Sequence, residues 1–388
     1  MNKLKKQFSG VLATTAVLLC SSLSPFASAS AATTSILLGD ANGDGYVNIA
    51  DATFIVQYLG GKYVVNAKNF TAMDVNEDGV IDETDQRMIQ YLEAGYTSSK
   101  IGTIVNKTCY TLPLSNAVQY RRHDCSDSNL KSYKTYTIPV GESTNAVEDI
   151  PVAYASQDNT KDNENIACVE ISSSIGVGSG FIVSNNTIAT AAHCIYNDSS
   201  NEFAKNVKVK VYVDENVSYT ASAEFLHMPS KYINGNDCDV NYDYALIRVG
   251  DFKDKNGNKV NVGKYSVNLG IMTDEFINAK KGSLTSVGYT TIDNIHTRYQ
   301  STGVISPDIP SHEYAYRYHI ESKGGGGKSG GMTYFDSSYT FPGSSSTINT
   351  RSTVGVHTSG GDGYKSYGVR VNLNLIRFYK MSKLFEGA

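Results

Sequence analysis

Short apolar segments alternate with turn-forming Gly, Asn, Asp and Ser residues along most of the chain after about residue 150. Such short runs, spaced by turn residues, are typical of a β-sandwich or β-barrel. The clearest runs lie at 167–171, 180–183, 207–213 and 244–249. A helical pattern over 373–385 closes the chain. The pattern therefore predicts an all-β C-terminal domain.

The N-terminal part has a different pattern, because an Asp/Asn-rich segment at Asp40 recurs 34 residues later at Asp74. Each copy is followed by apolar residues at helical spacing, and glycines end each helix. The apolar positions are Phe54, Ile55 and Tyr58 in the first copy and Met88, Ile89 and Leu92 in the second. We expect a small α-helical module of two loop–helix repeats over residues 36–96.

A basic start, a short apolar stretch at 11–19 and small residues up to Ala31 predict a secretory signal peptide over residues 1–31. A lipoprotein anchor at Cys20 is the alternative, although the bulky Leu19 precedes it. Residues 97–149 are rich in Ser, Thr, Asn and Lys, with a possible strand at 132–139, and are interpreted as a linker and probable prosegment. The remaining residues, 150–388, form the predicted β domain.

The net charge of −4 over 388 residues gives no electrostatic reason to expect nucleic acid or an anionic membrane as partner. No segment beyond the signal is long and apolar enough to span a bilayer. Removal of the signal leaves five cysteines, so at least one thiol is free or intermolecular. Cys109 and Cys125 are candidates for one disulfide, and the spacing does not suggest zinc. The five are Cys109, Cys125, Cys168, Cys194 and Cys238.

The two Asp/Asn-rich segments fit a 12-residue calcium loop, which supplies oxygens from positions 1, 3, 5, 7, 9 and 12 and needs Gly at position 6. Both copies have the glycine, and both have Asp instead of Glu at position 12. One such stretch alone is usually a solvated turn, but two complete copies predict two Ca²⁺ sites. The predicted ligands are Asp40, Asn42, Asp44, the Tyr46 carbonyl, Asn48 and Asp51, then Asp74, Asn76, Asp78, the Val80 carbonyl, Asp82 and Asp85.

A calcium loop followed by one helix, twice over, resembles the dockerin module of cellulosome enzymes. The resemblance implies docking to a cohesin module of a scaffold protein. Its recognition positions correspond to Ile49, Ala50, Gln57 and Tyr58 in the first repeat and to Glu83, Thr84, Tyr91 and Leu92 in the second. The two sets differ, which argues against a symmetric binding mode. The alternative is a purely structural calcium staple.

Three motifs further along supply the groups that acyl transfer by a serine requires. Thr190-Ala-Ala-His193-Cys194 offers a general base, Asn241-Tyr-Asp243 offers a carboxylate to orient it, and Ser329 is the nucleophile in a glycine-rich turn at 324–331. The amides of Gly327 and Ser329 are the predicted oxyanion donors. The catalytic prediction is therefore His193, Asp243 and Ser329.

Each motif has a less specific interpretation. A histidine is more often a surface or satisfied core residue than a base, and Asp237 or Asp239 would be the replacement for Asp243. A Gly/Ser tract is usually a flexible linker. The joint presence of three motifs in the order His, Asp, Ser favours the catalytic interpretation.

The segments around Glu170–Gly176, His193, Asp243 and Gly355-Val-His357-Thr358 resemble the bacterial glutamyl endopeptidases over about residues 166–379. The resemblance implies two six-stranded antiparallel β-barrels of the chymotrypsin type with the active site between them, and cleavage after Glu, more weakly after Asp. It also implies that His357 binds the substrate carboxylate. A carboxylate needs donors, and Thr358 or Ser359 would add hydroxyls.

The sequence departs from that family at two positions. Gly178 stands near the place of a cysteine that usually pairs with the one after the catalytic histidine, so Cys194 would pair with Cys168 or Cys238 or stay reduced. Lys328 stands before the serine, where trypsin-type zymogens have an Asp that receives a new N-terminal amine. A lysine cannot take that role, so activation must differ.

The sequence as a whole predicts a secreted serine endopeptidase, docked by its calcium-binding module on a cell-surface or free scaffold, with no cofactor needed for the chemistry. Cleavage near Glu148–Asp149 would mature the enzyme and release the docking module. The alternatives are an inactive protease-like binding module, an active serine protease of other specificity, and a protein whose main role is docking.

Overall fold

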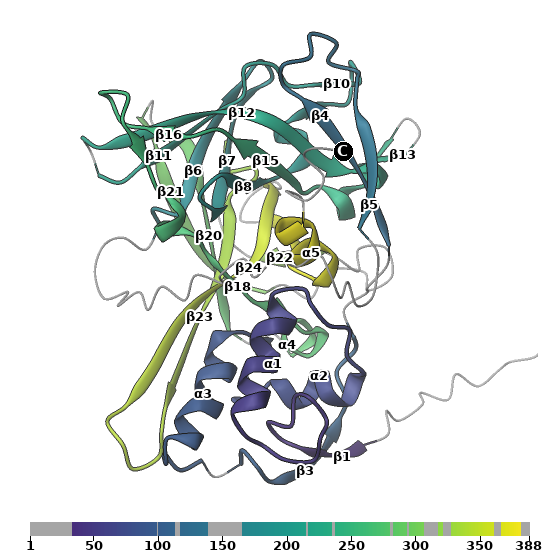
Figure 1. The fold of residues 1–388 in the computed structure, drawn as a ribbon, viewed down its shortest axis with the longest axis vertical. Coiled ribbons are helices and arrows are strands. Elements are labelled where there is room, and N and C mark those ends of the chain that lie inside the picture. The colour runs from purple at the N-terminus through teal and green to yellow at the C-terminus, as the bar shows by residue number, and fades with distance from the viewer. Residues whose placement is uncertain are drawn as a thin grey trace, which may run out of the picture. The chain divides into compact units, whose positions relative to one another are not determined.

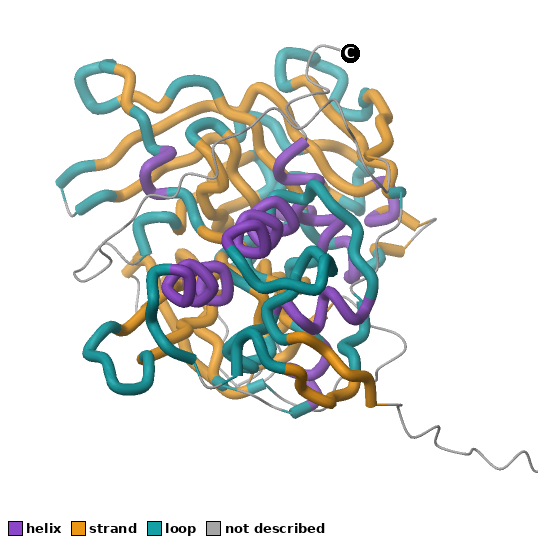
Figure 2. Tube along the Cα trace, turned by 60° about the horizontal axis from the view of Figure 1, so that its bottom comes forward, coloured by secondary structure: helices purple, strands orange, loops and turns teal. Residues whose placement is uncertain are grey.

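The computed structural model describes residues 33–98, 100–112, 117–138, 165–214, 216–234, 237–279, 282–292, 295–305, 317–320, 327–360 and 366–381. The predicted signal peptide, the Glu148–Asp149 cleavage site and Gly324–Gly326 lie outside these residues. No helix within the described ranges is long and apolar enough to cross a membrane. Strands dominate the fold and helices are few (Figure 2).

The N-terminal repeats form the two predicted helices, α1 (Ile49–Leu59) and α3 (Glu83–Glu93), which lie side by side (Figure 1). Helix α2 (Ala67–Met73) was not expected. Each repeat helix begins with a capping box in which the loop's last two predicted ligands exchange hydrogen bonds with backbone amides: Asn48 with Asp51, and Asp82 with Asp85. Strands β1 (Thr33–Leu37) and β3 (Ile104–Thr108) pair antiparallel and flank the repeats in sequence.

A closed six-stranded barrel follows in the order β6, β7, β8, β15, β12 and β11, with β11 paired back onto β6. Its interior is aliphatic and fully buried, with Val169, Ile182, Leu226 and Ile247 among its residues. The strands are β6 (Cys168–Ser173), β7 (Gly176–Ser184), β8 (Thr187–Thr190), β11 (Lys208–Tyr212), β12 (Ser218–Pro229) and β15 (Ala245–Val249).

Part of the segment expected to be linker and prosegment is integrated into this first sheet. Strand β4 (Val118–Asp124) pairs antiparallel with β12, and β5 (Lys134–Ile138) pairs with β4. Strand β5 lies where the sequence indicated a strand near 132–139. The hairpin extends the barrel's sheet, so these residues have structure of their own, and the domain boundaries stay a prediction.

The second sheet has the path β21, β20, β23, β24, β25 and β22, with β18 joined in parallel to β24. Helix α5 (Leu373–Met381) follows it, within the predicted 373–385 helix. The bounds are β18 (Asn268–Leu269), β20 (Ser283–Ile292), β21 (Ile295–Val304), β22 (Arg317–Ile320), β23 (Met332–Thr340), β24 (Thr347–Gly360) and β25 (Ser366–Arg370). The all-β prediction with a small helical N-terminal module is confirmed.

The shorter elements connect these sheets. They are β2 (Val80–Ile81), β9 (Tyr196–Asn197), β10 (Glu202–Phe203), β13 (Ile233–Asn234), β14 (Asp237–Cys238), β16 (Phe252–Lys253), β17 (Lys259–Val260), β19 (Ile271–Met272), α4 (Asp274–Asn278) and 3₁₀ turns at Ala192–Cys194, Ser230–Tyr232, Val240–Tyr242 and Gly263–Tyr265.

The second repeat bonds directly to the second sheet and its connections. Strand β2 of that repeat pairs antiparallel with β19. Ser352 donates to Asp82 at 2.8 Å, and Ser337 donates to Asp78 at 2.8 Å. Because these contacts join backbone and buried side chains, the repeat is part of the same folded body as the sheet.

Candidate functional site

His193 and Asp243 meet at the end of two paired strands of the first barrel. His193 lies in the 3₁₀ turn that follows β8, and Asp243 lies just before β15, with Ala245 opposite Thr190 in the ladder. The His193 Nδ1 lies 2.8 Å from the Asp243 Oδ2, and the His193 amide donates to Oδ1 at 3.1 Å. This double contact orients the ring and leaves Nε2 as the atom able to act as a base.

The Asp243 carboxylate stabilises the charged form of the His193 imidazole, which forms when the ring accepts a proton. Burial alone would lower the pKa of His193, but the adjacent Asp243 carboxylate outweighs burial and raises it. The His193 side chain is about one-third exposed while that of Asp243 is buried. Of the alternatives, Asp239 accepts from the Asn241 amide instead, and the side chain of Asp237 lies outside the described part.

Ser329 is held in a tightly packed turn, not in a flexible linker. A Cβ on Gly330 would lie 2.1 Å from the Ser179 carbonyl oxygen and from the Thr190 hydroxyl. Gly327 has φ +92°, where other residues are strained. The Ser329 carbonyl accepts from the Ser179 amide at 2.7 Å and from the Cys194 Sγ at 3.3 Å. The Ser329 backbone is thus tied to the residue that follows His193.

The Ser329 hydroxyl donates to the Thr358 carbonyl at 3.1 Å. No hydrogen bond joins Ser329 to His193 in the described part of the chain. Serine–histidine contacts are often long before substrate binds. The Gly327 and Ser329 amides have no acceptor among the described residues. Both groups therefore suit their predicted roles once a substrate is present.

His357 is brought beside the nucleophile loop by two backbone hydrogen bonds. Gly330 donates to the His357 carbonyl at 2.7 Å, and the His357 amide donates to Gly331 at 2.8 Å. The side chain is buried, and its Nδ1 lies 3.2 Å from the Ser286 Oγ. Burial, and then the charges of Lys328 and His193, lower the pKa of His357 to about 3. His357 is therefore neutral at ordinary pH.

Thr358 and Ser359, the other predicted specificity residues, have different surroundings. Thr358 is buried, and its hydroxyl donates to the Tyr367 carbonyl at 3.4 Å. Ser359 is exposed. Both follow His357 directly on strand β24.

The first calcium loop is closed by its own acidic side chains. The Asp40 carboxylate accepts from the Gly43 and Gly45 amides, and the Asp51 carboxylate accepts from Asn42 and Asn48. Asn42 and Asp44 also bond to each other. The oxygens of the predicted ligands are therefore gathered around one turn.

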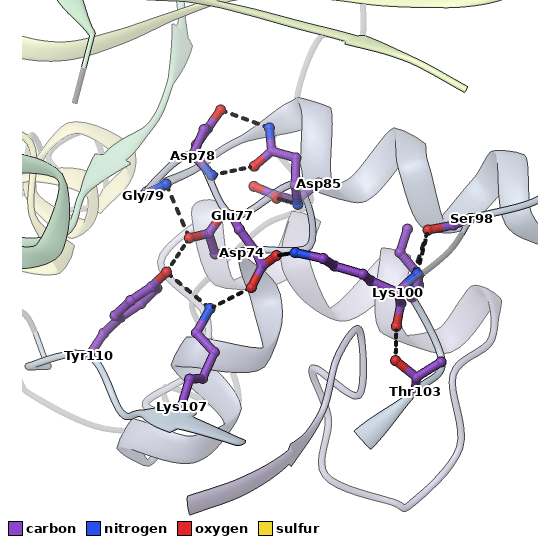
Figure 3. Close-up of polar contacts among 12 residues, drawn as sticks. Asp74, Glu77, Asp78, Gly79, Asp85, Ser98, Lys100, Thr103, Lys107 and Tyr110 are labelled. Carbon is purple, nitrogen blue, oxygen red and sulfur yellow. Dashed lines mark hydrogen bonds and ion pairs between the residues drawn. The ribbon is translucent and has the colours of Figure 1, made fainter. Parts of the chain in front are cut away.

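The second loop repeats this pattern and is more deeply buried. Asp74 accepts from the Gly79 amide at 3.1 Å, and Asp85 accepts from Val75 and Asp82 at 2.9 Å (Figure 3). Burial raises the pKa of Asp85 well above its ordinary range, and the carboxylates of Asp74, Asp82 and Asp78 add to the rise. Among the described residues, no three His, Cys, Asp or Glu side chains converge as a metal site does.

Residues after the repeats contact the second loop as well. The Tyr110 hydroxyl donates to Asp74 at 2.5 Å, and Lys100 and Lys107 form ion pairs with Glu77 (Figure 3). These contacts could not be predicted, because the segment at 100–110 is polar and was interpreted as part of a linker. Through these contacts, the segment at 100–110 stabilises the second loop.

Known families match both the N-terminal repeats and the β domain of this chain. Residues 38–93 match the Dockerin type I domain, and residues 155–321 match Trypsin. The chain carries a dockerin domain and a trypsin-like serine protease domain. The predicted resemblance to dockerins and to chymotrypsin-like serine proteases is confirmed.

A curated relative, the glutamyl endopeptidase of Bacillus licheniformis, is 31% identical over 210 residues, which are 53% of this chain and 59% of the relative. The chain thus spans about three-fifths of that relative. Solved structures that resemble the trypsin-like domain include a Glu endopeptidase (17% identity, TM-score 0.42, 57% of this chain and 94% of that one) and the thermostable serine protease AL20 from an extremophilic microorganism (19%, 0.40, 56% and 96%).

Four cysteines in the described part of the chain are thiols. Cys168 and Cys194 are free, and so are Cys109 and Cys125, which the sequence suggested as a pair. The side chain of Cys238 lies outside the described residues. A Cβ on Gly178 would lie 2.9 Å from the Cys194 Sγ. Gly178 therefore occupies the position from which a cysteine would reach Cys194.

Three serines around the loop were missed by the sequence analysis. Ser179 accepts from the Tyr289 amide and donates to the Gly327 carbonyl, both at 2.7 Å, which holds the turn before Lys328. Ser286 and Ser301 contact His357 and Lys328, respectively. Serines are too common for any of the three to be singled out without the strand pairing. Their role becomes visible only in the fold.

Proposed function

We propose that the protein is a secreted serine endopeptidase that cleaves after Glu, and more weakly after Asp, through His193, Asp243 and Ser329. The observation that carries the proposal is the His193–Asp243 contact at 2.8 Å, next to a loop that presents Ser329. A base, its orienting carboxylate and a hydroxyl in one place are what acyl transfer by serine requires.

In this mechanism the Ser329 Oγ attacks the substrate carbonyl carbon while His193 Nε2 takes its proton. The carbonyl oxygen becomes an oxyanion that accepts from the Gly327 and Ser329 amides. The protonated His193 then gives its proton to the leaving amine, which leaves an acyl-enzyme. A water molecule repeats the two steps, releases the new carboxylate and restores Ser329. Asp243 stabilises the imidazolium in both halves without taking a proton.

The preference for Glu is assigned to His357. Its backbone is hydrogen-bonded to Gly330 and Gly331, next to Ser329, and its side chain is buried. A carboxylate bound there would be desolvated and would need a hydrogen-bond donor. The Bacillus licheniformis relative is named for glutamyl cleavage, which supports the same choice.

A peptide panel that differs only in the residue before the scissile bond tests this function. Glu should be cut best, then Asp, and Gln, Lys and Phe poorly. Ser329→Ala should abolish cleavage and fluorophosphonate labelling, whereas His357→Gln should keep the labelling and lose the Glu preference. A different preferred residue would remove the role of His357, and a properly folded wild type that neither cuts nor labels would favour the inactive binding-module alternative.

We further propose that each dockerin loop binds one Ca²⁺ ion through its predicted oxygens. The donor set fits a hard cation, since it consists of carboxylates, amide oxygens and backbone carbonyls around one glycine turn. Bound calcium would neutralise the crowded carboxylates of the second loop, three of which are fully buried. The ion would stabilise the domain and take no part in peptide cleavage.

Cohesin docking is assigned to the first repeat. Ile49 is 52% exposed, whereas Thr84, which is the equivalent of Ala50 in the second repeat, is fully buried against Thr350. Glu83 accepts from Asn268, and Tyr91 stacks on Phe341. Tyr58 is buried in the dockerin core and cannot contact a partner without unfolding. The second set of recognition positions is thus engaged within this chain.

Binding of the full chain to immobilised cohesin modules, with calcium or with a chelator, tests this assignment. Ile49→Arg should abolish capture, and the matched change Glu83→Arg should leave it intact. Loss of capture in Glu83→Arg alone would reverse the assignment. Capture that resists both the chelator and Ile49→Arg would contradict the assignment, and a folded wild type that cohesin does not capture at all would leave the structural calcium staple as the better account.

A further inference from the structure

A buried lysine lies directly before the nucleophile and has no part in the mechanism above. Lys328 is 0% exposed, and its Nζ donates to the Ser301 Oγ at 2.7 Å. The same Nζ lies 5.8 Å from the centre of the Tyr299 ring. Burial of an ammonium group is costly unless it is paired or hydrogen-bonded. Lys328 is therefore a buried charge whose hydrogen bond to Ser301 offsets part of its desolvation, one residue from Ser329.

The acceptor of this lysine lies opposite the serine that contacts His357. Strands β20 and β21 pair antiparallel with Ser286 directly facing Ser301. Side chains of a directly opposed pair stand on the same face with Cβ atoms about 4.5–5.5 Å apart. In the neighbouring pair of this ladder, the hydroxyls of Thr285 and Thr302 lie 2.8 Å apart. Ser301 contacts Lys328 and Ser286 contacts His357, so the two facing serines lie between these side chains. We name these four residues the polar relay.

The chemistry of its first member gives the relay a direction. A lysine ammonium has only donors, so Ser301 must accept from it with an oxygen lone pair. Ser301 then has its own proton to donate toward Ser286, and Ser286 has its proton to donate to the His357 Nδ1. A neutral imidazole that accepts at Nδ1 has its only N–H at Nε2.

We propose that Lys328, acting through Ser301 and Ser286, holds His357 in the tautomer that donates from Nε2 and so makes it a receptor for the substrate carboxylate. Lys328 is in this account a positioning residue, and the inference rests on the proposed preference for Glu. The opposite tautomer would turn a lone pair toward the carboxylate and repel it. It would also accept the amide N–H of Gln and so favour Gln, whereas the Nε2–H tautomer can donate to either side chain but bonds the charged carboxylate of Glu more strongly.

Ser301→Ala and its matched control Ser301→Thr test the relay without touching Ser329 or His357. Kinetics are measured on two peptides that differ only in Glu or Gln before the scissile bond. Ser301→Ala should lower the Glu/Gln ratio of kcat/KM about tenfold, the size of one hydrogen bond to a charged group, mainly through KM for the Glu peptide. Ser301→Thr keeps the hydroxyl and should keep the ratio. Lys328→Met should lower the ratio further.

The tautomer itself is measured by ¹⁵N NMR of the histidine side chains, with the His357 signals assigned by their loss in His357→Gln. The expected wild-type result is a protonated Nε2 and an unprotonated Nδ1. This measurement needs no activity, so it decides the matter even where a variant folds poorly.

The outcomes separate the relay from the function on which it rests. A wild type that prefers Glu, together with an unchanged ratio in Ser301→Ala or a protonated Nδ1, overturns the relay and leaves the proposed function standing. A wild type without Glu preference overturns the proposed specificity first, and the role of the relay with it.

Discussion

At the scale of single residues, the contact of Gly178 with Cys194 shows how one substitution changes the chemistry of a site. A Cβ on Gly178 would lie 3.4 Å from the Cβ of Cys194, at the lower edge of the 3.5–4.5 Å found in disulfides. The backbone of Gly178 is not in the left-handed region, so a side chain is tolerated there. The chain thus has a disulfide position from which only one sulfur is missing.

We therefore predict that Gly178→Cys forms a disulfide with Cys194. The bond would close a loop of roughly 15 residues, for which constraint of the unfolded chain contributes about 3 kcal/mol. Thiol titration should show the loss of one free thiol relative to wild type, and urea unfolding should show a gain that a reductant removes. Gly178→Ser is the control without a sulfur. Two free thiols at these positions in the oxidised variant would contradict the prediction.

His227 is a buried base outside the candidate site. It is fully buried on β12, and the Tyr136 hydroxyl lies 2.8 Å from its Nδ1. Burial, and then the charges of Arg122 and Arg248, lower its pKa to about 3. Its pKa is about 6.5 in the unfolded chain. Between these values the unfolded state binds a proton that the folded state does not, so stability falls as pH falls below 6.5.

His227→Gln should reduce this acid sensitivity. One such histidine lowers the free energy of unfolding by about 1.4 kcal/mol per pH unit. Between pH 6.5 and 5, the free energy of unfolding of the wild type should therefore fall by about 2 kcal/mol more than that of the variant. His357, whose pKa is lowered in the same way, remains in both proteins and adds the same slope to each. Urea unfolding at the two pH values provides the measurement. Equal losses in both proteins would show that His227 does not titrate as described.

The residues of the proposed triad could be singled out from the sequence because each stands in a short local motif typical of its proposed role. Asp243 stands two residues before a strand, and His193 stands three residues after the end of one. The relay serines were not predictable, since Ser286 and Ser301 meet only through the register of a hairpin. Sequence reasoning thus recovers groups that act alone and misses groups defined by strand pairing.

At the scale of elements, the dockerin helices and a strand at β5 were predictable, and strand β4 was not. The helices begin at Asn48 and Asp82, which are good N-caps, and both carry an acidic residue three positions later. Strand β4 contains Arg121, Arg122 and His123, and its polarity resembles that of a linker. Its arginines lie over aromatic rings, Arg121 on Tyr133 and Arg122 on Phe225, which explains why a charged strand is stable there.

Removal of calcium tests the dockerin loops as elements. A chelator should lower the melting temperature of the full chain, because the loops would keep their carboxylates together without a cation. The same treatment should leave fluorophosphonate labelling of Ser329 unchanged below the melting transition. Asp40→Asn/Asp51→Asn should reduce the chelator effect, since one site would already be lost. An identical melting temperature with and without calcium would contradict the presence of either ion.

At the scale of the whole molecule, the chain before residue 139 is bound to the trypsin-like domain at several independent places. Strand β4 pairs with β12 over five residues, from Tyr120 opposite Pro229 to Asp124 opposite Phe225. Tyr120 stacks on Phe378 of α5 with ring centres 4.1 Å apart. Arg377 of the same helix donates to the Gly61 carbonyl after α1 at 3.0 Å. Together with the β2–β19 pairing, these contacts do not depend on the covalent connection at 139–164.

Cleavage near Glu148–Asp149 should therefore leave the dockerin domain attached to the trypsin-like domain, in contrast to the release expected from the sequence. The two fragments should elute together in native size-exclusion chromatography and separate in urea. Tyr120→Ala, which removes the ring stacked on Phe378, should promote dissociation, because loss of a buried aromatic ring costs about 3–5 kcal/mol. Tyr46→Ala, at a side chain that is 72% exposed, is the matched control and should not. If the fragments of the cleaved wild type separate without denaturant, the strand pairing is too weak to hold them, and maturation frees the enzyme from its scaffold. If the two fragments stay associated, the cleaved enzyme remains attached to the scaffold through its dockerin domain.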